Sequence, residues 1–108
     1  MSIVPQISTA SMMESAVESY FSGNTEHAWN LFNDLLAREP GNLNAMAYAA
    51  LICDQRGEID QAIELVVKIL HLRPAAQVHY NLGVLLKKKG DLKQALEVFQ
   101  RAALLQPD

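Results

Sequence analysis

The chain is poor in cysteine, in aromatic residues and, over its first third, in positive charge. Cys53 is the only cysteine among 108 residues, so no internal disulfide can form; we expect a reducing compartment and a core-filling role for Cys53. No lysine or arginine occurs in residues 1–37, and the net charge is −3. This balance argues against nucleic acid as a partner.

Long apolar runs are also missing. Residues 1–13, MSIVPQISTASMM, carry no basic residue and no sustained apolar segment, so we do not expect a secretory signal. No stretch approaches the roughly 20 residues that cross a bilayer, which argues against a membrane partner. Because 50% of the residues are apolar, we predict one soluble, cytoplasmic domain with a modest core.

What the chain does contain is an internal repeat, which has to be recognised before the fold is predicted. Gly23, Gly57 and Gly90 recur at a step of about 34 residues. An alanine, an apolar residue four positions later and a proline follow each glycine at constant spacing. These positions are Ala28, Phe32 and Pro40, then Ala62, Val66 and Pro74, then Ala95, Phe99 and Pro107.

Each repeat predicts two amphipathic helices, one before the glycine and one between the glycine and the proline. The glycine tolerates the left-handed conformation that ends the first helix. A polar or acidic residue follows it at the start of the second helix, namely Asn24, Glu58 or Asp91. Because proline cannot continue a helix, the next helix has to start afresh. No helix pair can bury its apolar face alone.

In these residues the chain resembles the tetratricopeptide repeat family, a helix pair of about 34 residues with the pattern W-x₂-L-G-x₂-Y, A-x₃-F and P. The third repeat matches best, although His79 replaces the tryptophan and Leu86 the tyrosine. The matching positions are His79, Leu82, Gly83, Leu86, Ala95, Phe99 and Pro107, then Met46, Ala49, Ala50, Cys53, Ala62, Val66 and Pro74, then Met12, Ser15, Ala16, Ser19, Ala28, Phe32 and Pro40.

The resemblance implies an all-α fold, a right-handed superhelical solenoid of three antiparallel helix pairs. We place the repeats at about 9–42, 43–75 and 76–108, after a tail of residues 1–8 in which Ile3, Val4 and Ile7 could form a short strap. We expect Gly83 to let two helices cross closely, and Ala95 and Phe99 to interlock as small and large side chains.

Residues that could carry chemistry are few. No two of His27, His71 and His79 have the spacing that places two metal ligands on one helical face, and Cys53 has no cysteine neighbour. The chain has no glycine-rich phosphate loop and no nucleophile elbow. We therefore predict that the protein is not an enzyme and takes no metal or cofactor, and that His79 is a packed core residue.

The resemblance implies that the first helix of each pair lines a concave groove for a partner protein. Tyr20 and Phe21 either line that groove or pack between helices, since adjacent residues point about 100° apart. The groove would be apolar and aromatic at one end and basic at the other, which suits a peptide or helix with an acidic flank. The positions are Met13, Val17, Tyr20, Phe21, Ala47, Leu51, Asp54, Gln55, Tyr80, Asn81, Val84, Lys87 and Lys88.

Two known binding habits of the family are not reproduced. The lysine and asparagine positions that grip chaperone C-termini hold Met13, Val17 and Tyr48 here. Asn81 matches the asparagine ladder of other members, but the equivalent positions hold Glu14 and Tyr48, so we expect Asn81 to be a solvated polar residue. The lysine run 87–89 is either a solvated face or the basic end of the groove.

Charge and the C-terminal helix together suggest self-association. The first repeat totals −4, the second −1 and the third +2, which favours head-to-tail contact between copies. The last helix, however, ends in an apolar stripe that a further helix or another chain would cover. We expect Leu96, Ala103 and Leu104 to mediate this contact, with a symmetric homodimer slightly favoured because surface charges contribute little.

From these patterns we predict a protein-binding module without catalysis. Two alternatives stay open. The module could have a structural role, assembling end to end or forming the N-terminal part of a larger tetratricopeptide protein or enzyme. It could also be a small chaperone for a secreted subunit, a role that some three-repeat members of the family play.

Overall fold

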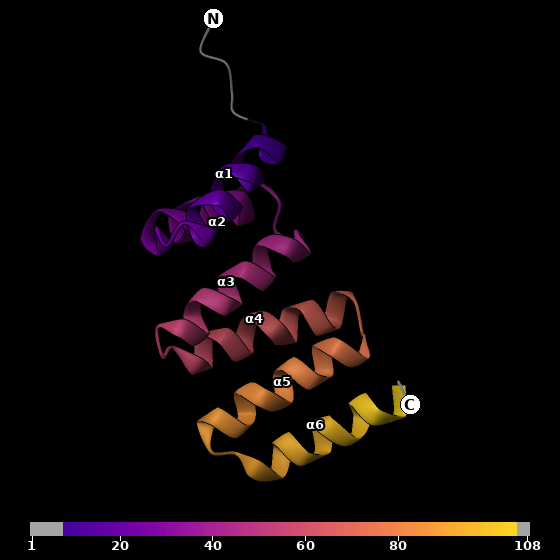
Figure 1. The fold of residues 1–108 in the computed structure, drawn as a ribbon. Coiled ribbons are helices and arrows are strands. Elements are labelled where there is room, and N and C mark those ends of the chain that lie inside the picture. Colours follow the sequence, from indigo (N-terminus) through magenta and orange to yellow (C-terminus); the bar gives the residue numbers. More distant parts are fainter. Residues whose placement is uncertain (1–7, 106–108) are drawn as a thin grey trace, which may run out of the picture. The chain divides into compact units, whose positions relative to one another are not determined.

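The computed structural model describes residues 8–105, and this part of the chain consists of helices joined by short turns. The expectations for the tail, Ile3, Val4 and Ile7 among them, and for Pro107 lie outside the described residues. Between residues 8 and 105 there are six α-helices and no strand (Figure 1), which confirms the all-α class. They are α1 Thr9–Phe21, α2 Thr25–Arg38, α3 Leu43–Gln55, α4 Ile59–Leu72, α5 Ala76–Lys89 and α6 Leu92–Leu105.

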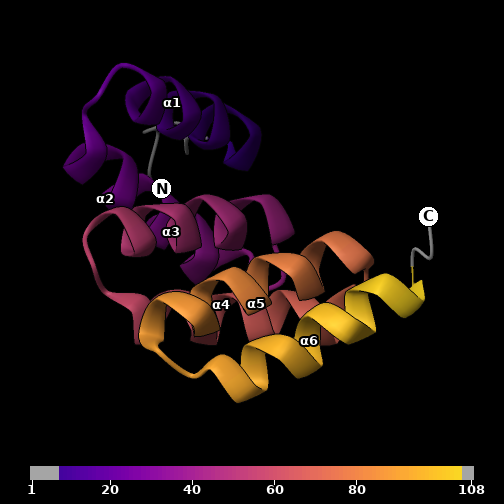
Figure 2. The ribbon, with the colours of Figure 1, turned by 60° about the horizontal axis from the view of Figure 1, so that its bottom comes forward.

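The chain divides into two units, residues 1–45 and residues 46–108. In the first unit α1 packs against α2. In the second unit α4 packs against α5 and α5 packs against α6; both views show these three helices side by side (Figure 1, Figure 2). Most of α3 also belongs to the second unit, because the boundary falls between Ala45 and Met46.

The turn inside each helix pair has the same geometry three times. The repeat glycines have φ angles of 88°, 78° and 96° at Gly23, Gly57 and Gly90, a conformation that costs a side-chain-bearing residue about 1–2 kcal/mol. The amide of the next residue donates five residues back, from Asn24 to Ser19, from Glu58 to Cys53 and from Asp91 to Leu86, at 2.8–2.9 Å. This is the Schellman ending, which satisfies carbonyls that the helix would otherwise leave unpaired.

The starts of the second helices differ from one another. The Asp91 carboxylate accepts a hydrogen bond from the Gln94 amide at 3.2 Å and so caps α6. Asn24 and Glu58, whose backbones have ψ of 68° and 66°, make no side-chain cap. At α1 the cap is Ser8, whose Oγ accepts from the Ser11 amide at 3.1 Å.

Small residues occupy the helix-crossing positions of the core. Ala16 and Ala28 are buried in the first unit, and Ala50, Ala62 and Ala95 in the second. The largest side chains with almost no exposed surface are Phe32, Leu35, Met46, Ile52 and Cys53. Small residues opposite large ones let neighbouring helices approach closely.

Gly83 shows how close this approach becomes. A Cβ atom placed on Gly83 would lie 2.5 Å from Cε1 and 2.7 Å from Cδ1 of Phe99. The Phe99 ring therefore occupies the space of the missing side chain, as expected for a glycine at a helix crossing. The ring also contacts Tyr80 of the same helix as Gly83, with ring centroids 5.5 Å apart.

Candidate functional site

The second unit contains a cleft formed by α3, α4 and α5. Its volume is about 520 Å³ and its lining is mainly apolar. The polar side chains that reach it are those of Asp54, Tyr80 and Asn81. The lining residues are Ala47, Ala50, Leu51, Asp54, Val66, Ile69, Val78, Tyr80, Asn81, Val84 and Leu85.

Two adjacent helices bring the predicted groove residues of this unit together. Six of them line the cleft, namely Ala47, Leu51, Asp54, Tyr80, Asn81 and Val84. Gln55, Lys87 and Lys88 lie on the same two helices, near their C-terminal ends, outside the lining. Val66 and Ile69 of α4 also line the cleft, although the repeat pattern predicts groove residues only on the first helix of each pair. Their apolar character at the spacing i, i+3 was the available signal.

Exposed apolar side chains stand at the edge of the cleft. Leu51 of α3 is 47% exposed, and Tyr80 of α5 is also exposed. A single exposed leucine needs no explanation, but large apolar side chains gathered around a concave apolar surface are typical of a binding site. The cleft can therefore hold apolar side chains of a ligand.

Charge at one end of the cleft is fixed by an ion pair between α3 and α5. The Lys88 ammonium donates to both carboxylate oxygens of Asp54, at 2.9 and 2.8 Å. Lys89 pairs with Asp60 at 2.7 Å, and this hydrogen bond raises the pKa of the Lys89 ammonium. Within the described residues Lys87 has no ion pair and is exposed. The basic end is therefore largely neutralised inside the unit.

The four predicted groove residues of the first repeat lie on α1, in the other unit. Met13, Val17 and Tyr20 are half-buried, whereas Phe21 is exposed. The Tyr20 and Phe21 rings contact each other edge to face, with centroids 5.2 Å apart. The cleft of the second unit is formed without these residues.

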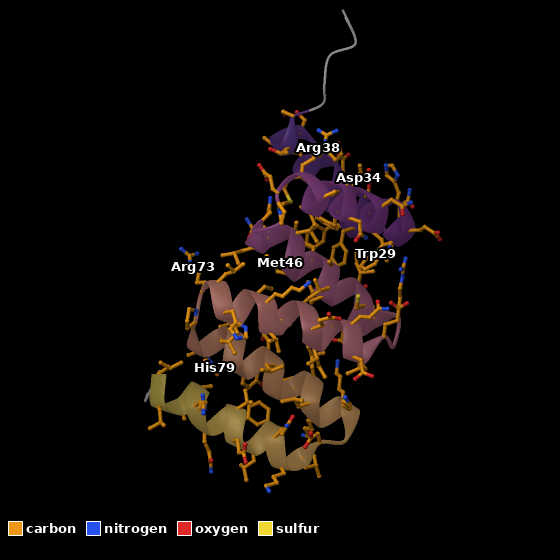
Figure 3. All side chains as sticks on the ribbon, turned by 180° about the vertical axis from the view of Figure 1, so that it is seen from behind. Trp29, Asp34, Arg38, Met46, Arg73 and His79 are labelled. Carbon is orange, nitrogen blue, oxygen red and sulfur yellow. The ribbon has the colours of Figure 1, made fainter. Side chains whose placement is uncertain are left out.

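Cys53 and His79 lie in the interior of the second unit. Cys53 has no exposed surface, and burial raises the pKa of its thiol, with the Glu58 carboxylate adding to the effect. His79 is 8% exposed, and its Nδ1 donates to the Ala75 carbonyl at 3.1 Å; Figure 3 labels it on α5. No three histidine, cysteine or carboxylate side chains within residues 8–105 are grouped so that they could hold a metal ion.

A second hollow, of about 550 Å³, lies between α5 and α6. Within the described chain it is lined by α5 and α6 alone, through Ala76, Gln77, Tyr80, Phe99, Ala102 and Ala103. Leu96 of α6 is 58% exposed and lies one turn before Phe99. Among the described residues Leu104 is the most exposed large apolar residue, at 81%, and like Leu96 it is not part of the lining of the hollow.

None of the six helices is both long and apolar enough to traverse a bilayer.

Comparison with known proteins gives a family for the last repeat and a fold for nearly the whole chain. Residues 76–108 match the family model of the tetratricopeptide repeat. Among curated proteins no sequence matches the chain.

Solved structures of MamA are similar to 93%, 94% and 92% of this chain. A crystal structure of MamA has a TM-score of 0.85 at 20% identity, MamA of AMB-1 a TM-score of 0.84 at 24%, and MamA of Desulfovibrio magneticus RS-1 a TM-score of 0.83 at 21%. The chain spans 59%, 56% and 56% of the length of these proteins. At such identities the likeness establishes the fold.

Proposed function

Since the chain is an all-helical array of tetratricopeptide-type helix pairs, we propose that it is a non-catalytic module that binds a peptide or helix of a partner protein. Helical repeats of this kind use the extended surfaces between their stacked helices for binding. The observation that carries the proposal is the apolar cleft between α3 and α5, which gathers Leu51, Tyr80 and Val84 around a floor of Val66 and Ile69.

The ligand suited to this cleft has apolar anchors. The lining offers aliphatic side chains from three helices and few polar groups, so binding energy has to come mainly from burying apolar surface, at roughly 25 cal/mol per Å². An amphipathic helix or an extended segment with alternating apolar residues meets this requirement. The Asn81 amide at the edge is placed to hydrogen-bond a ligand backbone, although its Oδ1 already accepts from Gln77 at 2.9 Å.

An acidic flank on the ligand would extend past the cleft toward the C-terminal end of α5. Lys87 is exposed there and carries an unpaired charge within the described chain. Lys88 is a weaker contact for the flank, because the Asp54 carboxylate that accepts two of its N–H groups balances its charge. We propose that Lys87 contacts the flank directly, while the Asp54–Lys88 pair limits how strongly acid is preferred.

By the repeat equivalence, Met13, Val17, Tyr20 and Phe21 on α1 would extend the binding surface. The proposal does not depend on them, because the second unit forms its cleft alone.

Selection from a library of random linear peptides tests this function. Peptides enriched on the folded protein should carry apolar anchors, and their affinity should fall about tenfold or more with Leu51→Glu, because the substitution places an unpaired carboxylate against an apolar ligand. The matched control is Leu72→Glu. Leu72 is 58% exposed on α4 and lies outside the cleft, so its substitution should leave the affinity unchanged.

The far-UV circular dichroism of both variants should equal that of the unaltered protein, since both leucines are already exposed to water. If no peptide is enriched, or if both variants bind equally well, the cleft is not the binding site. If Leu51→Glu unfolds the protein, Leu51 belongs to the core and the groove register is wrong.

A further inference from the structure

We propose that two copies of this chain pair through the hollow between α5 and α6, as a two-fold symmetric dimer. The contact surface consists of Tyr80 on α5 and of Leu96, Phe99 and Ala103 on α6. It is separate from the α3–α5 cleft, which shares only Tyr80 with it.

The internal repeat shows what this surface is built to contact. Tyr80, Phe99 and Ala102 each lie one repeat step after Ala47, Val66 and Ile69, in that order. In the second repeat those three positions line the cleft together with Val78 and Leu85 of α5, so a helix packs beside them. The hollow is therefore the same apolar interface, continued by one repeat step, and in the described chain α5 and α6 are its only walls.

The surface is complementary to itself. It combines a hollow, lined by Phe99, Ala102 and Ala103, with a protruding leucine on the same helix, since Leu96 precedes Phe99 by three residues and Ala103 by seven. In a symmetric contact each residue i meets j while j meets i. Leu96 of each copy can therefore enter the hollow of the other, which buries apolar surface on both.

Head-to-tail contact with α1 of another copy fits less well. The face of α5 that packs against the second repeat carries Val78, Leu82 and Leu85, and in a head-to-tail contact the same face of α1 would pack on the hollow. The equivalent residues of α1, two repeat steps earlier, are Ser11, Ser15 and Glu18, and all three are exposed. A serine and glutamate face packed on the hollow would remove polar groups from water without partners, which costs free energy.

Charge does not reverse this preference. The basic character of the third repeat favoured the acidic first repeat of another copy, but two of its three consecutive lysines are paired inside the unit, Lys88 with Asp54 and Lys89 with Asp60. These pairs reduce both the attraction toward an acidic end and the repulsion between two identical faces. The choice between symmetric and head-to-tail pairing therefore depends on the contact between apolar side chains.

Sedimentation velocity of the full chain over a concentration series tests the dimer. As the protein concentration increases, the average molecular mass should rise from 12.0 kDa, the mass of one chain, toward twice that value and then stay constant. Leu96→Lys should raise the dissociation constant by about a hundredfold, because the ammonium would enter an apolar hollow. Leu104→Lys is the matched control. Leu96 shares a helical face with Phe99 and Ala103, whereas Leu104 directly follows Ala103 and points about 100° away from it. Contrary to the sequence prediction for Leu104, its substitution should therefore leave the dimer intact.

Ala103→Glu tests the same face by a second substitution at an exposed alanine, in case Leu96→Lys loses its helical signal. A chain that stays monomeric at all concentrations overturns the proposal. So does a dimer that survives both substitutions, or a mass that keeps rising with concentration, which marks head-to-tail assembly. Because Leu51→Glu leaves the hollow untouched and Leu96→Lys leaves the cleft untouched, failure here and failure of the peptide-binding function are distinguishable.

Discussion

Replacing Gly83 by alanine tests the close helix crossing of the third repeat. In an exposed helix this substitution stabilises by about 1 kcal/mol, because alanine loses less backbone entropy than glycine. Here the new Cβ atom would lie 2.5 Å from Cε1 of Phe99, so the ring has to move. The ring also contacts Tyr80, at a centroid distance of 5.5 Å, and overpacking of this kind costs about 1–3 kcal/mol.

Comparison with the first repeat narrows the expected cost of Gly83→Ala. Ala16 and Phe32 occupy the equivalent positions there and both are buried, so alanine and phenylalanine can be combined once the helices are spaced for them. The cost in the third repeat therefore comes from displacing a packed ring. We expect Gly83→Ala to lower the free energy of unfolding by about 1 kcal/mol net.

The decisive test compares the effect of Gly83→Ala in the unaltered protein with its effect in a Phe99→Val variant. Phe99→Val reproduces the valine of the second repeat, where Ala50 faces Val66, and removes the ring that the new methyl group meets. In that background Gly83→Ala should stabilise by up to about 1 kcal/mol, which gives a coupling of about 2 kcal/mol between the two positions. Urea unfolding followed by far-UV circular dichroism measures all four proteins. Stabilisation by Gly83→Ala in the unaltered protein would refute the close crossing.

Three further predictions concern single residues of the second unit. The Cys53 thiol should react slowly with an alkylating reagent in the folded protein, and Cys53→Ala should cost about 1 kcal/mol of stability. Because folding raises the pKa of this thiol, its contribution to stability should be complete below about pH 8.5 and fall as the pH rises toward the folded-state pKa; rapid alkylation would contradict the burial. Gly90→Ala should destabilise by about 1–2 kcal/mol because Gly90 has a φ of 96°, and an unchanged urea midpoint would speak against the left-handed turn. Asp54→Asn should release Lys88 and increase the affinity for peptides with an acidic flank. Fluorescence anisotropy measures this affinity, with the same peptides lacking the acidic residues as the control. If the substitution leaves the affinity unchanged, the ion pair plays no part in selectivity.

The fold could be predicted from the sequence because the residues that form each turn and each helix crossing recur in every repeat. Three glycines at nearly equal steps predict three left-handed turns, and the structure has them at Gly23, Gly57 and Gly90. The alanines that follow these glycines at constant spacing, Ala28, Ala62 and Ala95, are all buried. Such signals are local, since each depends on the chemistry of one residue at one turn or crossing.

Ile52 and Leu85 were missed although both are buried. The pattern of a single repeat describes packing inside one helix pair, whereas these positions in α3 and α5 are additional to that pattern. Their recurrence one repeat step apart was visible in the sequence, but the first repeat holds Glu18 at the same position and weakens the signal.

The ion pairs of the second unit could not be predicted from the sequence either. The run of lysines 87–89 could be read either as a solvated face or as a ligand-binding end. The pairs of Lys88 with Asp54 and of Lys89 with Asp60 join residues that are far apart in the sequence, and only the packing of neighbouring repeats brings them together. Likewise, Asp91 caps α6 whereas Asn24 makes no side-chain cap at α2, although both directly follow the repeat glycine.

The measurement that tests the central proposal most directly is a nuclear magnetic resonance titration of the isotope-labelled full chain with a selected peptide. We expect the largest amide shifts to cluster at Leu51 and Asp54 on α3 and at Asn81 and Val84 on α5, with Leu104 on α6 unaffected. Shifts centred on α6, or shifts spread evenly over the chain, would contradict binding in the cleft.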